Sequence, residues 1–97
     1  MMLAQVLGTV VAPYHHPVLE GERLLLVRPV TPTGEATGRA RIAIDRVDAG
    51  EGDRVLVVDE GNSARQLVGA PEGPVKTVVV GVVDTVELGG TVVFGVD

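Results

Sequence analysis

Short apolar runs separated by Gly- and Pro-containing segments recur along the chain, a pattern typical of strands joined by turns. The runs predict strands at residues 2–12, 24–30, 39–47, 54–58 and 75–88, and a further run at 91–96 can form a sixth. Loops are predicted between them at 14–22, 31–38 and 69–74. Gly8 is expected to mark a bend or a close backbone contact at a barrel corner. The pattern predicts an all-β chain.

The strand predicted at 39–47 alternates most regularly. One face carries Ala40, Ile42 and Ile44, and positions on or near the other carry Arg39, Arg41 and Asp45. Such alternation is typical of a strand with an apolar core face and a polar outer face.

The run at 75–88 is the longest and most apolar, and both of its faces are apolar. One would carry Val78, Val80 and Val82, and the other Val79, Gly81 and Val83. Because a small barrel has one interior, the face with Val79, Gly81 and Val83 is predicted to meet another chain. The alternative is that the helical turn or the C-terminal strand covers it.

The stretch from 42 to 65 combines a strand, a tight turn, a second strand and a helical turn. In the turn at 48–53, Gly50 and Gly52 can supply positive φ angles, and Asn62 or Ser63 can cap the helical turn. This unit makes up half of a small barrel. The predicted fold is an OB-like barrel of five or six antiparallel strands with one short helical turn, at residues 1–88, followed by a tail at 89–97.

Composition supports strands and a single domain. The chain has 97 residues, of which 21 are Val, and its only aromatic residues are Tyr14 and Phe94. β-Branched side chains suit a pleated surface better than a helix. The length allows one domain with one modest core.

The charge balance argues against several partner classes. Eight basic and thirteen acidic residues give a formal net charge of −5, which would repel nucleic acid and anionic membranes. The absence of cysteine excludes disulfides and thiolate metal sites. The sequence shows no signal-peptide pattern. Its apolar stretches are all shorter than the roughly 20 residues needed to span a bilayer, so we expect a cytoplasmic protein.

Five segments, taken in order, carry a specific resemblance. They are Q-V-L-G-T-V-V-A at 5–12, G-E-R-L-L-L-V at 21–27, the segment at 45–58, G-N-S-A-R at 61–65 and the segment at 74–86. With these, the chain resembles the vertex proteins of bacterial microcompartment shells, the family shared by carboxysomes and ethanolamine-utilisation compartments. It departs at Asp48, where the family commonly has Gly, and at Asn62, where Ser is common.

The resemblance implies a non-enzymatic shell protein with no cofactor. Such proteins form cyclic homopentamers of OB-like barrels at the corners of a shell that hexameric shell proteins otherwise tile, in the bacterial cytoplasm. The resemblance also implies that Gly61, Asn62, Ser63, Ala64 and Arg65 lie near the five-fold axis and the subunit contacts. A cyclic ring requires two different contact patches on each subunit.

Asp84 is predicted to lie at the same subunit interface as the motif at 61–65. It lies within the apolar run at 75–88, where a lone charge is costly unless it is paired. Arg65, Arg46 and backbone amides are the candidate partners. No second carboxylate or base accompanies Asp84 at a spacing that indicates catalysis.

The main alternative is an OB-fold module that binds nucleic acid or another ligand. Such a module needs a basic groove and stacking aromatic residues, which this composition lacks. A lipoyl or biotinyl carrier needs a lysine at a hairpin tip, whereas Lys76, the only lysine, begins a strand. No catalytic or metal-binding residue is predicted, because His15 and His16 are adjacent and diverge, and Ser63 lacks the second glycine of a nucleophile elbow.

Overall fold

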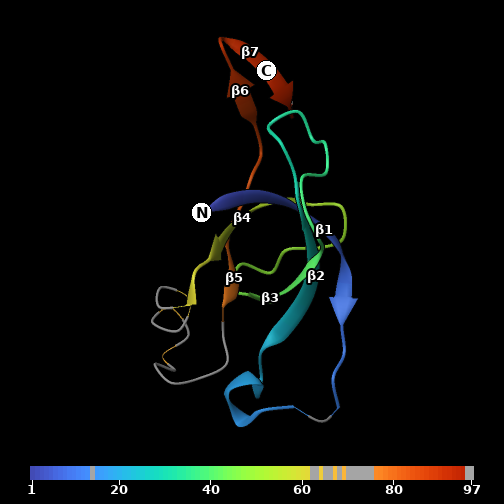
Figure 1. Cartoon of the computed structure of the whole chain (residues 1–97), viewed down its shortest axis with the longest axis vertical. Helices are drawn as coiled ribbons and strands as arrows, with labels where there is room; N and C mark the ends of the chain where they lie inside the picture. The colour runs from blue at the N-terminus through green and yellow to red at the C-terminus, as the bar shows by residue number, and fades with distance from the viewer. Residues whose placement is uncertain (14, 62–63, 65–66, 68, 70–75, 96–97) are drawn as a thin grey trace.

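The computed structural model of the chain describes residues 1–13, 15–61, 64, 67, 69 and 76–95 (Figure 1). Five strands form a closed barrel in the order β1-β2-β3-β5-β4, and β6 and β7 form a separate two-stranded sheet. The strands are β1 (Met2–Val10), β2 (Arg23–Pro29), β3 (Arg41–Asp45), β4 (Arg54–Asp59), β5 (Thr77–Val82), β6 (Val86–Leu88) and β7 (Thr91–Phe94). A 3₁₀ turn, η1 (Pro17–Leu19), lies in the loop before β2. The all-β barrel prediction is confirmed.

One strand pairing differs from the predicted antiparallel barrel. β3 and β5 run parallel, with Ile44 beside Val78, whereas the other neighbouring pairs in the barrel are antiparallel. The reason is geometric, because strand direction cannot alternate all the way round a closed ring with an odd number of strands. The connection from β3 to β5 includes β4, and it provides the long crossover that a parallel pair requires.

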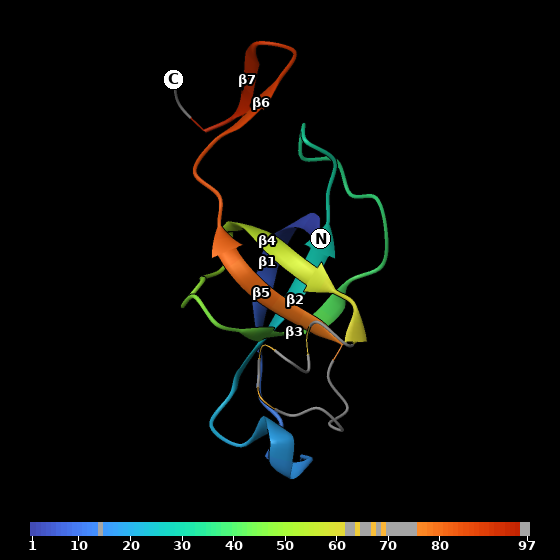
Figure 2. The same cartoon turned by 90° about the vertical axis from the view of Figure 1, so that its left-hand side faces the viewer.

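The barrel lies in the middle of an elongated molecule that measures 44 × 24 × 22 Å along its principal axes. The β6–β7 hairpin and the 31–38 loop extend from one end of the barrel, and the η1 loop extends from the other (Figures 1 and 2). The strand predicted at 75–88 is interrupted, since β5 ends at Val82 and β6 begins at Val86. The run predicted at 91–96 forms β7, which pairs with β6 outside the barrel.

Small aliphatic side chains fill the barrel. Its core consists of Ala4, Val6, Leu25, Val27, Ala43, Ala49, Val55, Val57 and Val79. A five-stranded barrel has a narrow interior, because barrel diameter grows with strand number. Valine and alanine fit this space, and the core formed by the described residues contains no aromatic side chain.

The bend expected at Gly8 is confirmed in the form of a β-bulge, whereas the alternative of a close backbone contact is wrong, because no atom of the described residues would lie within 4 Å of a Cβ there. Val6 pairs with Val27 but Gly8 pairs with Leu26, so Leu7 is the extra residue in β1. At the bulge, the N–H of Val6 donates to the carbonyl of Asp53 at 2.9 Å, so β1 pairs there with the 48–53 turn. The bulge therefore joins the turn to the barrel.

β3 directs its isoleucine side chains away from the barrel interior, so the alternation at 39–47 suggested the wrong core face. Ala43 lies in the barrel core and Asp45 is buried, whereas Ile42 is 56% exposed and Ile44 packs in a second cluster outside the interior. The narrow interior accommodates alanine more readily than isoleucine. Asp45 can be buried because hydrogen bonds satisfy its carboxylate.

The Asp45 carboxylate holds the turn that follows β3. Its side chain is 1% exposed and forms an ion pair with Arg23 at 2.7 Å. It accepts hydrogen bonds from the N–H groups of Val47 and Ala49, each at 3.1 Å, and Arg23 also donates to the Ala49 carbonyl. Because these buried polar groups satisfy one another, the network fixes the path of the chain from β3 toward β4.

The 48–53 turn takes its positive φ angles from Asp48 and Gly52, not from Gly50 as predicted. The angles are 58° at Asp48 and 88° at Gly52. Gly50 instead donates its N–H to the Asp53 carboxylate at 2.8 Å. Aspartate tolerates the left-handed region better than most residues, but glycine takes it without steric cost.

We expect Asp48→Gly to raise the free energy of unfolding by roughly 0.5 kcal/mol. The left-handed conformation costs a non-glycine residue about 1 kcal/mol, and the greater freedom of glycine in the unfolded chain offsets part of the gain. The lost contact between Arg23 and Asp48 is 3.5 Å long and the Asp48 side chain is 98% exposed, so it contributes little.

Urea denaturation at a fixed protein concentration measures this change. The matched control is Gly52→Ala, which introduces a side chain at φ 88° and is expected to shift the midpoint in the opposite direction. A lower midpoint for Asp48→Gly would contradict the assignment of strain to Asp48.

Candidate assembly interface

The helical turn packs on the outside of the barrel, over β3 and β5. Gly61 and Ala64 are helical, and the N–H of Ala64 donates to the carbonyl of Glu60 at 2.9 Å. Ala64 is fully buried against Ile44 and Val78. With only a methyl group at this position, the helical backbone can approach the sheet closely.

Three residues of the predicted interface motif, Asn62, Ser63 and Arg65, lie outside the described residues. Capping by Asn62 or Ser63, and a carboxylate contact by Arg65 near the ring axis, therefore stay predictions. Gly61 and Ala64 locate the motif just after β4, against the outer side of β3 and β5.

A β-bulge in β5 changes the face on which its residues lie. Val57 pairs with Val79, whereas the preceding residue Leu56 pairs with Gly81, so Val80 is the extra residue. Val79 is fully buried in the barrel core. The prediction that Val79 meets another chain is therefore corrected, because its side chain belongs to the core of its own subunit.

Past the bulge, Val82 carries the exposed apolar surface of β5. Val82 is 47% exposed, although the sequence pattern placed it on the face opposite the predicted interface. Gly81 lies beside Leu56, since an ideal Cβ at Gly81 would be 3.5 Å from Leu56 Cδ1. Val83 donates its N–H to the carbonyl of Arg54 at 2.8 Å. Contacts of Gly81 and Val83 with another chain stay predictions.

Asp84 is exposed in the bend between β5 and β6, so its predicted place within a strand is wrong, and its place at a subunit interface stays a prediction. The cost of burial that called for a partner does not arise. Arg46, one candidate partner, instead contacts Glu22 at 3.2 Å, and Arg65 lies outside the described residues. The Asp84 carboxylate is thus accessible from outside the subunit.

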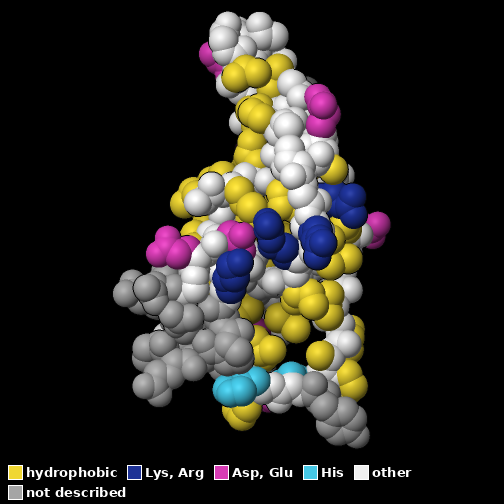
Figure 3. All heavy atoms as spheres, viewed as in Figure 1, with side chains coloured by type: hydrophobic (Ala, Val, Ile, Leu, Met, Phe, Trp, Pro, Cys, Tyr) yellow, Lys and Arg dark blue, Asp and Glu magenta, His cyan; other side chains and the backbone are white. Residues whose placement is uncertain are grey.

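The outer side of β2 and β3 presents an exposed apolar surface that the sequence pattern assigned to the core. Exposed Ile42 is directly paired with half-buried Leu26, and half-buried Leu24 is paired with Ile44, which is buried in the second cluster. Figure 3 shows Lys and Arg side chains gathered in the middle of this view of the molecule, with hydrophobic side chains below them. The alternation at 39–47 correctly placed Ile42 and Ile44 on one face of the strand, but that face points outward and not into the barrel.

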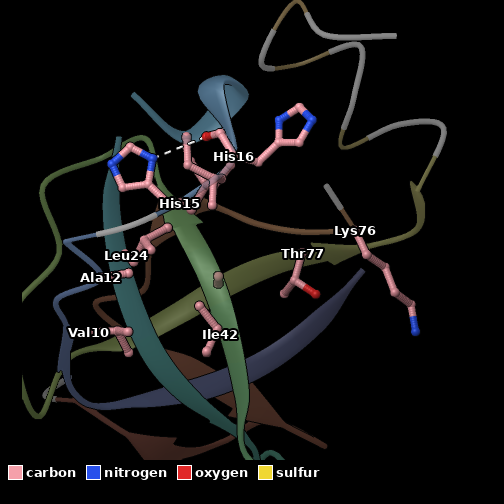
Figure 4. Close-up of a pocket in the computed structure, with 11 residues that line it drawn as sticks. Val10, Ala12, His15, His16, Leu24, Ile42, Lys76 and Thr77 are labelled. Atoms are coloured by element: carbon pink, nitrogen blue, oxygen red, sulfur yellow. Dashed lines mark hydrogen bonds between the residues drawn. The ribbon is translucent and has the colours of Figure 1, made fainter. Parts of the chain in front are cut away.

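The same side is hollowed into a pocket of about 420 Å³ (Figure 4). Val10, Leu24 and Ile42 are among the residues that line it, together with His15 and His16 from the loop after β1. His15 Nδ1 lies 3.1 Å from the carbonyl oxygen of His16, and the two rings point apart. A mainly apolar pocket of this kind suits a hydrophobic group better than a metal ion.

Within the described part of the chain, no three His, Asp or Glu side chains are placed to hold one metal ion. Across those residues, no helix has the length and apolar character needed to cross a bilayer.

A family model described as "Ethanolamine utilisation protein EutN/carboxysome" matches residues 1–84. The shell vertex protein EutN of Escherichia coli K12 is 42% identical over 94 residues, which cover 97% of this chain and 98% of EutN. The carboxysome shell vertex protein CcmL of a Synechocystis species is 42% identical over 88 residues, covering 91% of this chain and 87% of CcmL.

Solved structures agree with these sequence matches. A structure titled "Ethanolamine utilization protein, EutN" superposes with a TM-score of 0.89 at 41% identity, covering 98% of both chains. The GrpN pentameric microcompartment shell protein from Rhodospirillum rubrum superposes with a TM-score of 0.80 at 39% identity, covering 91% of this chain and 99% of GrpN.

Proposed function

The chain belongs to the ethanolamine utilisation protein EutN/carboxysome family, and from this membership we propose that it is a structural vertex protein of a bacterial microcompartment shell, assembled as a ring of five copies. The observation that carries the proposal is the superposition with the pentameric shell protein GrpN at a TM-score of 0.80 over 91% of this chain. Chains of the same fold that match over nearly their whole length can present the same contact surfaces.

Exposed apolar side chains on different sides of the barrel support assembly. Ile42 lies on β3, Val82 ends β5, and Leu7 lies at the bulge of β1. A cyclic ring is held by heterologous contacts, in which one patch of each subunit meets a different patch of the next. Apolar residues on more than one side of a 10.1 kDa subunit fit such an arrangement.

A ring of five has a geometric role in a shell. Units with six neighbours tile a plane, and replacing one of them by a unit with five neighbours introduces the curvature that closes a corner. The partners proposed for this chain are therefore hexameric shell proteins of the same compartment, in the bacterial cytoplasm. The role is structural and not enzymatic, in line with relatives named as shell vertex proteins.

Native mass spectrometry tests the proposal. We expect a species of about 50 kDa, five times the subunit mass of 10.1 kDa, at micromolar subunit concentration. A monomer under these conditions would contradict the ring. The alternative OB-fold binding role predicts a complex with single-stranded DNA at low salt, and we expect none from a chain with a net charge of −5.

A further inference from the structure

A ring of five requires two complementary surfaces on every subunit, and the structure offers a matched pair. We propose that the outer side of β2 and β3 of one subunit binds the segment that joins β5 to β6 in the next subunit, an inference that rests on the proposed ring. The first surface, the β2–β3 face, comprises Leu24, Leu26, Arg28 and Ile42, with exposed Arg39 in the segment just before β3. The second surface, the β5–β6 segment, comprises Val82, Asp84, Glu87 and Leu88.

The β2–β3 face combines an apolar centre with unpaired cations. Ile42 is 56% exposed and lies directly across from half-buried Leu26. Arg28 follows on the outer side of β2, and Arg39 precedes β3. Both arginines are exposed, and within the described residues neither forms an ion pair. Their guanidinium groups can hold carboxylates in a bidentate manner.

The β5–β6 segment shows the same combination with the opposite charge. Val82 is 47% exposed and Leu88 is 54% exposed. Asp84 and Glu87, which lie between them in the chain, are exposed, and neither has an ion-pair partner in the described part of the chain. Two exposed apolar and two exposed acidic side chains thus lie within the seven residues that lead from the barrel to the hairpin.

Charge decides which contact forms. Two β2–β3 faces would bring arginines together, and two β5–β6 segments would bring carboxylates together, so neither surface suits its own copy. A β2–β3 face against a β5–β6 segment pairs cations with carboxylates around buried apolar side chains. This is a heterologous contact, the kind that a closed ring requires.

The position of the segment makes the contact feasible. The β6–β7 hairpin projects beyond the barrel, so it can reach past its own subunit (Figures 1 and 2). Its strands have only three and four residues and pair only with each other among the described strands. Isolated two-stranded hairpins are marginally stable in water, so packing against a neighbour would stabilise this one.

Reversing the charges on each surface tests the pairing. Arg28→Glu with Arg39→Glu makes the β2–β3 face acidic, and Asp84→Arg with Glu87→Arg makes the β5–β6 segment basic. Each double variant is expected to raise the subunit concentration at which the ring half-dissociates by at least about tenfold, since like charges then face each other. A chain with all four substitutions has the charges of both surfaces exchanged, so the surfaces attract each other again and assembly is expected to be restored.

Cysteine cross-linking gives an independent readout, since the chain has no cysteine of its own. In a chain that carries both Ile42→Cys and Leu88→Cys, oxidation is expected to produce a ladder of covalent oligomers up to five subunits on a denaturing gel. Each single substitution should give no ladder. The control pair is Ile42→Cys with Glu51→Cys, which places the second thiol at an exposed position of the 48–53 turn, and it is expected to give no ladder.

Absence of the ring and absence of this particular pairing give different experimental results. A wild-type monomer in native mass spectrometry would refute the ring itself. A wild-type pentamer whose dissociation is unchanged by both charge reversals, and which gives no ladder from the 42 and 88 pair, would keep the ring but overturn this pairing. Circular dichroism of each variant separates loss of assembly from loss of folding.

Discussion

Replacing Asp45 by alanine is expected to lower the free energy of unfolding by about 2–4 kcal/mol, a large part of the stability of a domain of this size. The carboxylate is 1% exposed and accepts hydrogen bonds from the N–H groups of Val47 and Ala49. Without it, these donors have no partner, and an unsatisfied buried donor costs about 1–3 kcal/mol. Arg23 adds less to this cost because its half-exposed guanidinium can be hydrated.

Urea denaturation monitored by far-UV circular dichroism measures this loss for Asp45→Ala. Glu51→Ala is the matched control, because Glu51 is an exposed acidic residue of the neighbouring turn, and it is expected to change stability by less than about 0.5 kcal/mol. Equal unfolding midpoints for the two variants would show that the turn after β3 is held by something other than this carboxylate.

The sequence specifies the strands better than it specifies their inner faces. Positions of the strands and of the 48–53 turn follow from apolar runs and turn residues, which act locally. Which side of β3 faces inward depends on the width of the barrel, since Ala43 fits where Ile42 does not. The outer surface of the subunit is itself a proposed contact surface, so a strand can carry apolar residues on both sides. The alternation of polar and apolar residues then does not identify which side faces the core.

Two other differences arise from properties that alternation does not encode. The bulge at Val80 shifts the pattern along β5 by one residue and leaves Val79 in the core. The bend at Asp84 interrupts an apolar run that, by composition, continues as one strand. Parallel pairing of β3 and β5 could have been deduced, because a closed barrel of five strands cannot be antiparallel throughout.

The predicted place of residues 61–65 at the subunit interface follows from the family resemblance and not from a pattern of polar and apolar residues. Ala64 shows why, since its burial against Ile44 and Val78 is a tertiary contact between segments about twenty and fourteen residues apart in the chain. A single small residue in a helical turn carries no signal that identifies its partner. The exposed surfaces formed around Ile42 and Leu88, in contrast, follow from the three-dimensional structure alone.

Gly95→Ala is expected to open the β6–β7 hairpin while the barrel stays folded. Gly95 has φ 84°, and an ideal Cβ there would overlap the backbone carbonyl oxygen of Asp84 and lie 3.2 Å from Thr85 Cα. Backbone atoms cannot move aside as a flexible side chain can, so the two ends of the hairpin must separate. Overpacking and left-handed strain together cost roughly 2–4 kcal/mol. The adjacent Phe94 ring would lose its contact with the Arg54 guanidinium, 4.2 Å from the ring centre.

Amide hydrogen exchange distinguishes this local opening from global unfolding. For Gly95→Ala, the protection factors of amides in β7 are expected to fall at least about tenfold, whereas the amide of Val57 in the barrel keeps its protection. Gly89→Ala is the control, because its φ is also positive, at 59°, but no atom would lie within 4 Å of the new Cβ. If the hairpin positions Glu87 and Leu88 against a neighbouring subunit, Gly95→Ala weakens the ring and Gly89→Ala leaves it nearly intact. Equal assembly of both variants would show that the ring does not need the hairpin in this conformation.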